Sequence, residues 1–111
     1  MRIIDTGITK EILTGDNCPQ IKIGDKLYTV DNRQSTYDKI QKIQTTEGMS
    51  DEEKSKKMYE LALGVEGAKE ILSLDLPVEN NIYLTYCIMG AITGQDPKEL
   101  QELAKKQMSK N

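Results

Sequence analysis

The second half of the chain carries apolar residues at helical spacing, divided by clear signals that end one helix and begin the next. Pro77 disfavours a helical conformation at the residue before it and suits the start of the helix that follows. Gly94 suits the left-handed conformation that ends many helices. Asp96 and Pro97 fit the N-cap and first position of another helix. These signals predict helices over about 66–74, over 78–93 and from 97 onward.

The segment 78–93 is the most apolar of these, and its apolar residues cover more than one face of the predicted helix. A helix that is apolar nearly all round lies at the centre of a domain or at an interface with another protein. We therefore expect this helix to pack centrally and to keep a surplus apolar face for binding. The predicted core consists of Leu61, Ile71, Leu72, Ile82, Ile88, Met89, Ile92, Leu100 and Leu103.

Two further helices are predicted earlier in the chain. The first, over about 31–47, has a narrow apolar stripe, and Ser35 is its candidate N-cap. The second begins at Ser50, whose hydroxyl can accept a hydrogen bond from the Glu53 amide in a capping box. Gly64 is expected to end or bend this second helix.

The segment 20–30 carries the clearest β-strand signal. Its apolar and polar residues alternate on either side of Gly24-Asp25, which suits a two-residue hairpin turn. Pairing across that turn places Ile21 opposite Tyr28. A hairpin this short is marginal alone, so we expect it to pack on the helices or on a neighbouring copy of the chain.

Residues 1–19 have only weak patterning and are predicted to form a flexible N-terminal arm, with a short strand or a docking segment as the alternatives. The predicted fold class is mainly α. Residues 20–108 are expected to form one small helical domain of four to five helices with the hairpin at its N-terminal side.

The composition argues against several classes of function. The chain has 111 residues, a net charge of −3, two Arg and no His. Nucleic-acid binding favours Arg and a concentrated basic face, so no nucleic-acid partner is expected. Without His there is no general base of the usual kind, and two distant Cys make no zinc site. We therefore expect no enzyme activity and no catalytic, cofactor-binding or metal site.

The expected location in the cell follows from the lack of a membrane-spanning run and of a signal-peptide pattern in the sequence. No apolar run approaches the ~20 residues of a membrane-spanning helix, and the N-terminus lacks the apolar region of a signal peptide. A cytoplasmic protein with no membrane partner is expected. Cys87 lies in an apolar helical run and Cys18 in a loop, so a disulfide between them is not expected in a reducing compartment.

Four motifs occur in an order that supports a family resemblance. Leu63-Gly64 closes one helix, 68–76 has the form A-x-x-I-L-x-L-x-L, 88–94 reads I-M-x-A-I-T-G, and Asp96-Pro97 opens the last helix. Together with the hairpin sequence IKIGDKLYTV, this order resembles the tail assembly chaperones of long-tailed bacteriophages and prophages, particularly those of Gram-positive hosts. The resemblance covers roughly residues 20–106.

The resemblance implies a role and no catalytic residue. Members of that family bind the long, helical tape-measure protein, keep it soluble and help tail-tube subunits assemble around it in the host cytoplasm. Many are also made in a longer, frameshifted form. The implied partners are therefore the tape-measure protein and possibly the tail tube protein, with self-association into a homo-oligomer.

The candidate protein interface lies on the helix over 78–93. Aromatic side chains with a polar tip suit such contacts, which makes Tyr83 and Tyr86 candidate anchors, with Ile82 and Met89 beside them. Two alternatives remain at this point. One is a structural phage component, such as a head–tail connector or minor tail protein. The other is a small helix-turn-helix regulator, which the negative charge and the shortage of Arg disfavour.

Overall fold

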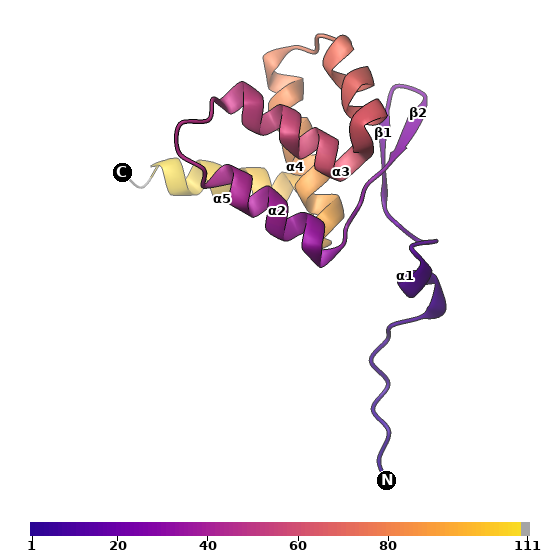
Figure 1. The fold of residues 1–111 in the computed structure, drawn as a ribbon. Helices are drawn as coiled ribbons and strands as arrows, with labels where there is room; N and C mark the ends of the chain where they lie inside the picture. The colour runs from indigo at the N-terminus through magenta and orange to yellow at the C-terminus, as the bar shows by residue number, and fades with distance from the viewer. Residues whose placement is uncertain (110–111) are drawn as a thin grey trace.

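The computed structural model describes residues 1–109, with side chains described through residue 107. It is mainly helical with one N-terminal hairpin, which confirms the predicted fold class. The elements in chain order are α1 (Lys10–Thr14), β1 (Gln20–Ile23), β2 (Lys26–Thr29), α2 (Gln34–Gln44), α3 (Asp51–Ser73), α4 (Val78–Thr93) and α5 (Pro97–Ser109). The four longer helices gather on one side of the hairpin, while the N-terminal segment runs away from them (Figure 1).

Most helix boundaries follow from the predicted end signals. The Ser50 hydroxyl accepts a hydrogen bond from the Glu53 amide at 3.2 Å, which caps α3. Asp96 accepts one from the Lys98 amide at 2.8 Å at the start of α5. Gly94 ends α4 with φ of 79°, a left-handed conformation that glycine adopts without a steric cost. The helix over 78–93 is confirmed with the expected bounds.

Two local features differ from the expectation, and a third agrees with it. Arg33 occupies the N-cap position of α2 without a side-chain cap, and Ser35 lies inside the helix. Gly64 bends the chain as expected: its φ and ψ of 84° and 163° are not helical and form a kink within α3. The arm contains the short helix α1, which starts where the Thr9 hydroxyl accepts from the Ile12 amide. Thr9 and Gly15 cap its two ends, but the five residues between them are too few for a helical pattern to show in the sequence.

The hairpin has the predicted register. Ile21 pairs with Tyr28 across the antiparallel strands, and Ile23 pairs with Lys26 beside the turn. Ile21 is buried among the helical core residues. Lys26 forms an ion pair with Glu70 of α3, so both strands are fastened to the helices. The hairpin therefore packs on its own helical domain.

The core lies where α2, the kinked α3 and α4 meet the hairpin. Its fully buried large side chains are Val30, Ile40, Met58, Ile71 and Ile88. Of the predicted core, Ile71 and Ile88 are buried, and Leu61, Met89, Ile92 and Leu100 are half-buried.

The prediction of burial is wrong for three core residues: Leu72, Ile82 and Leu103 are 47%, 49% and 53% exposed. Leu72 lies one position round the helix from Ile71, which takes the buried side of α3. Ile82 lies on a side of α4 that the other helices leave open. Leu103 is exposed because α5 packs chiefly against α4 and has no element on its outer side.

Candidate functional site

The candidate site is an open groove along α4, on the side that the core does not use. Leu84 and Ile88 point from α4 into the core. Ile82, Tyr86 and Met89 lie on another side of the same helix, because residues three and four apart share a helix face. Together with Thr85, Gln41 and Gln44, these three side chains line a groove of about 360 Å³ between α2 and α4.

A second depression continues this groove towards α3. The two hollows share Ile82 and Thr85, so they form one continuous surface across α4. The second encloses about 390 Å³, and its apolar lining includes Leu72 and Leu76. Leu72 and Ile82, two of the three exposed members of the predicted core, therefore both line this second depression, which is open to a partner.

The rim of the second depression is acidic. Asp51 and Glu52 from the first turn of α3, and Asp75 from the turn after it, line its edge. Near the floor, burial raises the pKa of Tyr59, and a hydrogen bond with Thr85 partly offsets that effect. Tyr59 is therefore a neutral group, and the acidic side chains of the depression are those of Asp51, Glu52 and Asp75.

The structure brings three of the four candidate interface residues together. Ile82, Tyr86 and Met89 line the groove, whereas Tyr83 does not. Tyr83 is half-buried on a different side of α4. Partial burial raises the pKa of its phenol, and the nearby Cys87 and Asp96 raise it further. Tyr83 therefore lies near Cys87 and outside the groove.

Sequence reasoning missed the α2 side of the groove. Gln41 and Gln44 stand beside the apolar stripe of α2, in which Ile40 is buried and Ile43 half-buried. Their positions next to the stripe were visible in the sequence. Which helix they would face was not, because that depends on how α2 and α4 meet.

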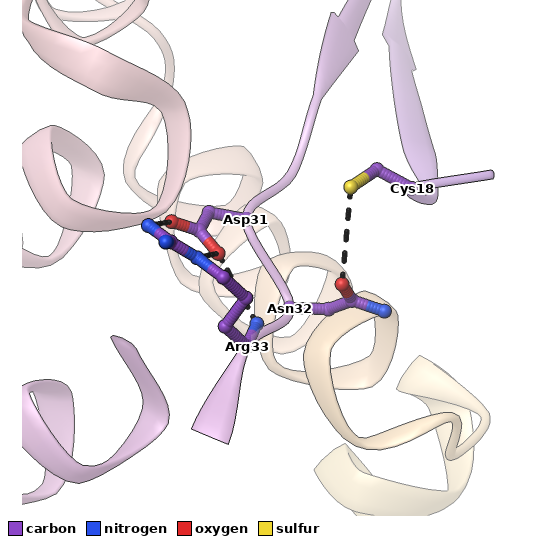
Figure 2. Close-up of polar contacts among 4 residues, drawn as sticks. All are labelled: Cys18, Asp31, Asn32 and Arg33. Carbon is purple, nitrogen blue, oxygen red and sulfur yellow. Dashed lines mark hydrogen bonds and ion pairs between the residues drawn. The ribbon is translucent and has the colours of Figure 1, made fainter. Parts of the chain in front are cut away.

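A polar cluster joins the hairpin to α2 (Figure 2). The Asp31 carboxylate accepts hydrogen bonds from the Arg33 amide, Nε and Nη2, at 3.1, 2.9 and 2.7 Å. The Arg33 guanidinium thereby holds the pKa of Asp31 at about 2. The Asp31 amide donates to the carbonyl of Ala62 at 2.8 Å, and the Cys18 thiol lies 3.9 Å from the side-chain oxygen of Asn32. This cluster fixes the chain between elements, and its guanidinium already has a partner.

Among residues 1–109, no three His, Cys, Asp or Glu side chains gather as a metal site would require. Burial raises the pKa of the Cys87 thiol, which makes it less reactive at neutral pH. Across the same residues, no helix combines the length and the apolar character needed to span a bilayer.

Comparison of the chain with known protein families, with curated proteins and with solved structures found no match.

Proposed function

We propose that this protein is a non-enzymatic binding protein that acts as a phage tail assembly chaperone. Its client is the tape-measure protein, and its binding site is the groove lined by Ile82, Tyr86 and Met89. By covering an apolar helical segment of the client, it keeps that segment soluble until tail-tube subunits assemble around it. It acts in the cytoplasm of the host cell.

The observation that carries the proposal is the open apolar side of α4. Exposed apolar side chains that lie together, with polar residues at their edge, are typical of surfaces that bind other proteins. The groove follows a helix and is bounded by a second helix, which suits an amphipathic client helix that inserts side chains at a spacing of three or four residues. The resemblance in the order of the helix signals supplies the identity of that client.

The acidic rim indicates which charges the client helix carries. Asp51, Glu52 and Asp75 lie beside the apolar lining, so a complementary client helix carries Lys or Arg next to its apolar side chains. Charges at the rim steer association and are screened by salt. Binding should therefore weaken moderately as ionic strength rises and should not be abolished.

The test is co-expression with the tape-measure protein of the same phage or prophage, followed by purification and titration calorimetry. A variant with Tyr86→Ala and Met89→Ala is expected to bind at least about tenfold more weakly, as loss of central interface residues does. Tyr83→Ala is the matched control on the same helix, because Tyr83 does not line the groove. Undiminished binding by the groove variant, with its fold intact by circular dichroism, would overturn the proposed site.

The alternative function is a structural phage component, such as a head–tail connector or a minor tail protein. An exposed apolar surface would serve a permanent interface equally well. The two functions differ in whether the protein remains in the finished phage particle. Mass spectrometry of purified phage particles is expected to find the tape-measure protein and not this chain. Stoichiometric recovery of this chain from the particles would favour the structural function.

A further inference from the structure

The N-terminal arm carries three exposed isoleucines, Ile3, Ile4 and Ile8. Residues 1–9 are not part of a helix or strand, and every one of them is exposed. Ile3 is 89% exposed and Ile4 70% exposed. Ile and Thr, both β-branched, make up most of the segment 3–9, and such residues favour strands. An arm of this composition is suited to become a strand once it has a neighbour.

The hairpin offers an unpaired edge to such a strand. The sheet consists of β1 and β2 alone, so the outer edge of each has no strand beside it in the described chain. The Val30 amide donates to the Pro19 carbonyl at 2.9 Å, which makes Val30 and Pro19 a hydrogen-bonded pair. Hydrogen-bonded and non-hydrogen-bonded pairs alternate in an antiparallel ladder. The amides and carbonyls of Leu27 and Thr29 therefore point away from β1.

The residues that carry these outward groups are largely exposed, and the open edge ends at Asp31, whose outward amide donates to the Ala62 carbonyl. The β2 residues are exposed apart from Tyr28, which is half-buried, and the Leu27 side chain is 55% exposed. Nothing in residues 1–109 forms a hydrogen bond with the backbone of Leu27 or Thr29 on that outer side. A strand edge that is left open in this way is a template for another strand.

The arm cannot reach this edge in its own chain in the arrangement that the structure shows. It leaves the base of the hairpin through α1 and runs away from it, opposite to the hairpin tip (Figure 1). A second copy of the chain has no such restriction. We propose that residues 2–6 of one copy add as a third strand to the outer edge of β2 in a second copy.

The proposed pairing fits both partners in length and in side chains. Five arm residues suffice to cover the four residues of β2. Neighbouring residues in a strand point to opposite faces of the sheet, so one of Ile3 and Ile4 lies on the Leu27 face in either register. The other lies on the Tyr28 face, next to the helices. Both isoleucines thereby lose exposure to water, which favours association.

The interface joins different surfaces of the two copies. Each copy donates an arm and accepts another on β2, so copies joined head to tail form a ring or an open chain, and two copies that exchange arms close as a dimer. This self-association uses the arm and the hairpin and leaves the α4 groove free. It is therefore independent of the proposed client binding.

The first test is sedimentation velocity of the full chain over a range of concentrations. The unmodified chain is expected to form assemblies larger than a monomer. Ile3→Asp with Ile4→Asp should shift it to the monomer, and Leu27→Pro should do the same because proline removes an outward amide and blocks the edge. Lys22→Pro is the matched control, since Lys22 pairs with Leu27 and its amide points outward on the β1 edge instead. A monomeric unmodified chain, or assemblies that the arm variant leaves unchanged, would overturn the proposal.

Mixing the two defective variants tests the head-to-tail arrangement. The arm variant keeps an intact β2 edge, and the Leu27→Pro variant keeps an intact arm, so the mixture should form a one-to-one heterodimer while each alone is monomeric. Absence of the heterodimer, with both variants folded by circular dichroism, contradicts the arrangement.

Cysteine cross-linking keeps the test decisive if Leu27→Pro fails to fold. Cys18 and Cys87 are free and are first replaced by Ser and Ala. Copies with Ile3→Cys or with Ile4→Cys are then each mixed with a copy carrying Leu27→Cys and oxidised. A disulfide between the copies is expected for the one of the two that lies on the Leu27 face. Efficient cross-linking of Ile4→Cys to Ile82→Cys in place of Leu27→Cys would place the arm in the α4 groove and overturn the proposed edge.

Discussion

Gly90 of α4 and Pro97 of α5 approach so closely that a side chain on Gly90 has no room. A Cβ atom at Gly90 would lie 3.2 Å from Cγ of Pro97 and 2.6 Å from the carbonyl oxygen of Gln95. Gly90 is buried and lies within a helix, so the position needs glycine for space and not for an unusual backbone angle. This contact lets α5 fold back tightly after the turn at Gly94.

Replacing Gly90 by Ala is expected to destabilise the domain by about 1–3 kcal/mol, because the added methyl group meets a backbone oxygen that cannot easily move. Urea denaturation followed by circular dichroism measures the change in the free energy of unfolding. The control is Asn80→Ala, at an exposed position of the same helix. Unchanged or increased stability of Gly90→Ala would mean that the turn between α4 and α5 opens freely.

Much of the fold could be predicted because its signals are local. The bounds of α4 follow from Pro77 and Gly94, two residues whose conformational limits act on their immediate neighbours. The hairpin register follows from a two-residue turn, since the turn length fixes which residues pair.

The side from which α4 is covered could not be predicted in the same way. Ile82 and Ile88 are chemically identical, yet one is 49% exposed and the other fully buried. The difference arises from contacts with elements distant in sequence, which no local pattern records. Ile82, Tyr86 and Met89 could be identified as candidates because they share one predicted helix. Gln41 and Gln44 could not, because they reach the groove only through the packing of α2 on α4.

Truncation of these two isoleucines should therefore have unequal effects. Ile88→Ala is expected to cost about 2–5 kcal/mol, because it leaves a cavity in the core. Ile82→Ala should cost less than about 1 kcal/mol, since the side chain is already half in water. Thermal and urea denaturation of both variants gives the comparison. Equal losses would mean that the open side of α4 is covered in solution.

The two serines that were candidate caps should also differ. Ser50→Ala is expected to lower the free energy of unfolding by about 1 kcal/mol, since the Glu53 amide loses its acceptor. Ser35→Ala should change it by only a few tenths of a kcal/mol, because Ser35 lies inside α2 and caps nothing. Urea denaturation at neutral pH distinguishes them. A larger loss at Ser35 would contradict the observed start of α2.

The Asp31–Arg33 pair should make stability depend on pH in the acid range. Its hydrogen bonds with the Arg33 side chain lower the pKa of Asp31 from 3.8 to about 2 in the folded protein. A carboxyl whose pKa is lower in the folded than in the unfolded state adds stability when it is ionised in both. That contribution is present above about pH 5 and is lost as the pH falls towards about 2.

Arg33→Gln removes the cause of this shift and should destabilise the domain at neutral pH by about 1 kcal/mol. The loss is smaller than the pKa shift alone would suggest, because the Arg33 side chain is 74% exposed and water screens the pair. The difference between Arg33→Gln and the unmodified chain should shrink as the pH approaches about 2, where Asp31 becomes protonated in both. Arg2→Gln, in the exposed arm, is the control and should show no such dependence. A stability difference that stays constant from neutral to acid pH would show that Arg33 acts through packing and not through the charge of Asp31.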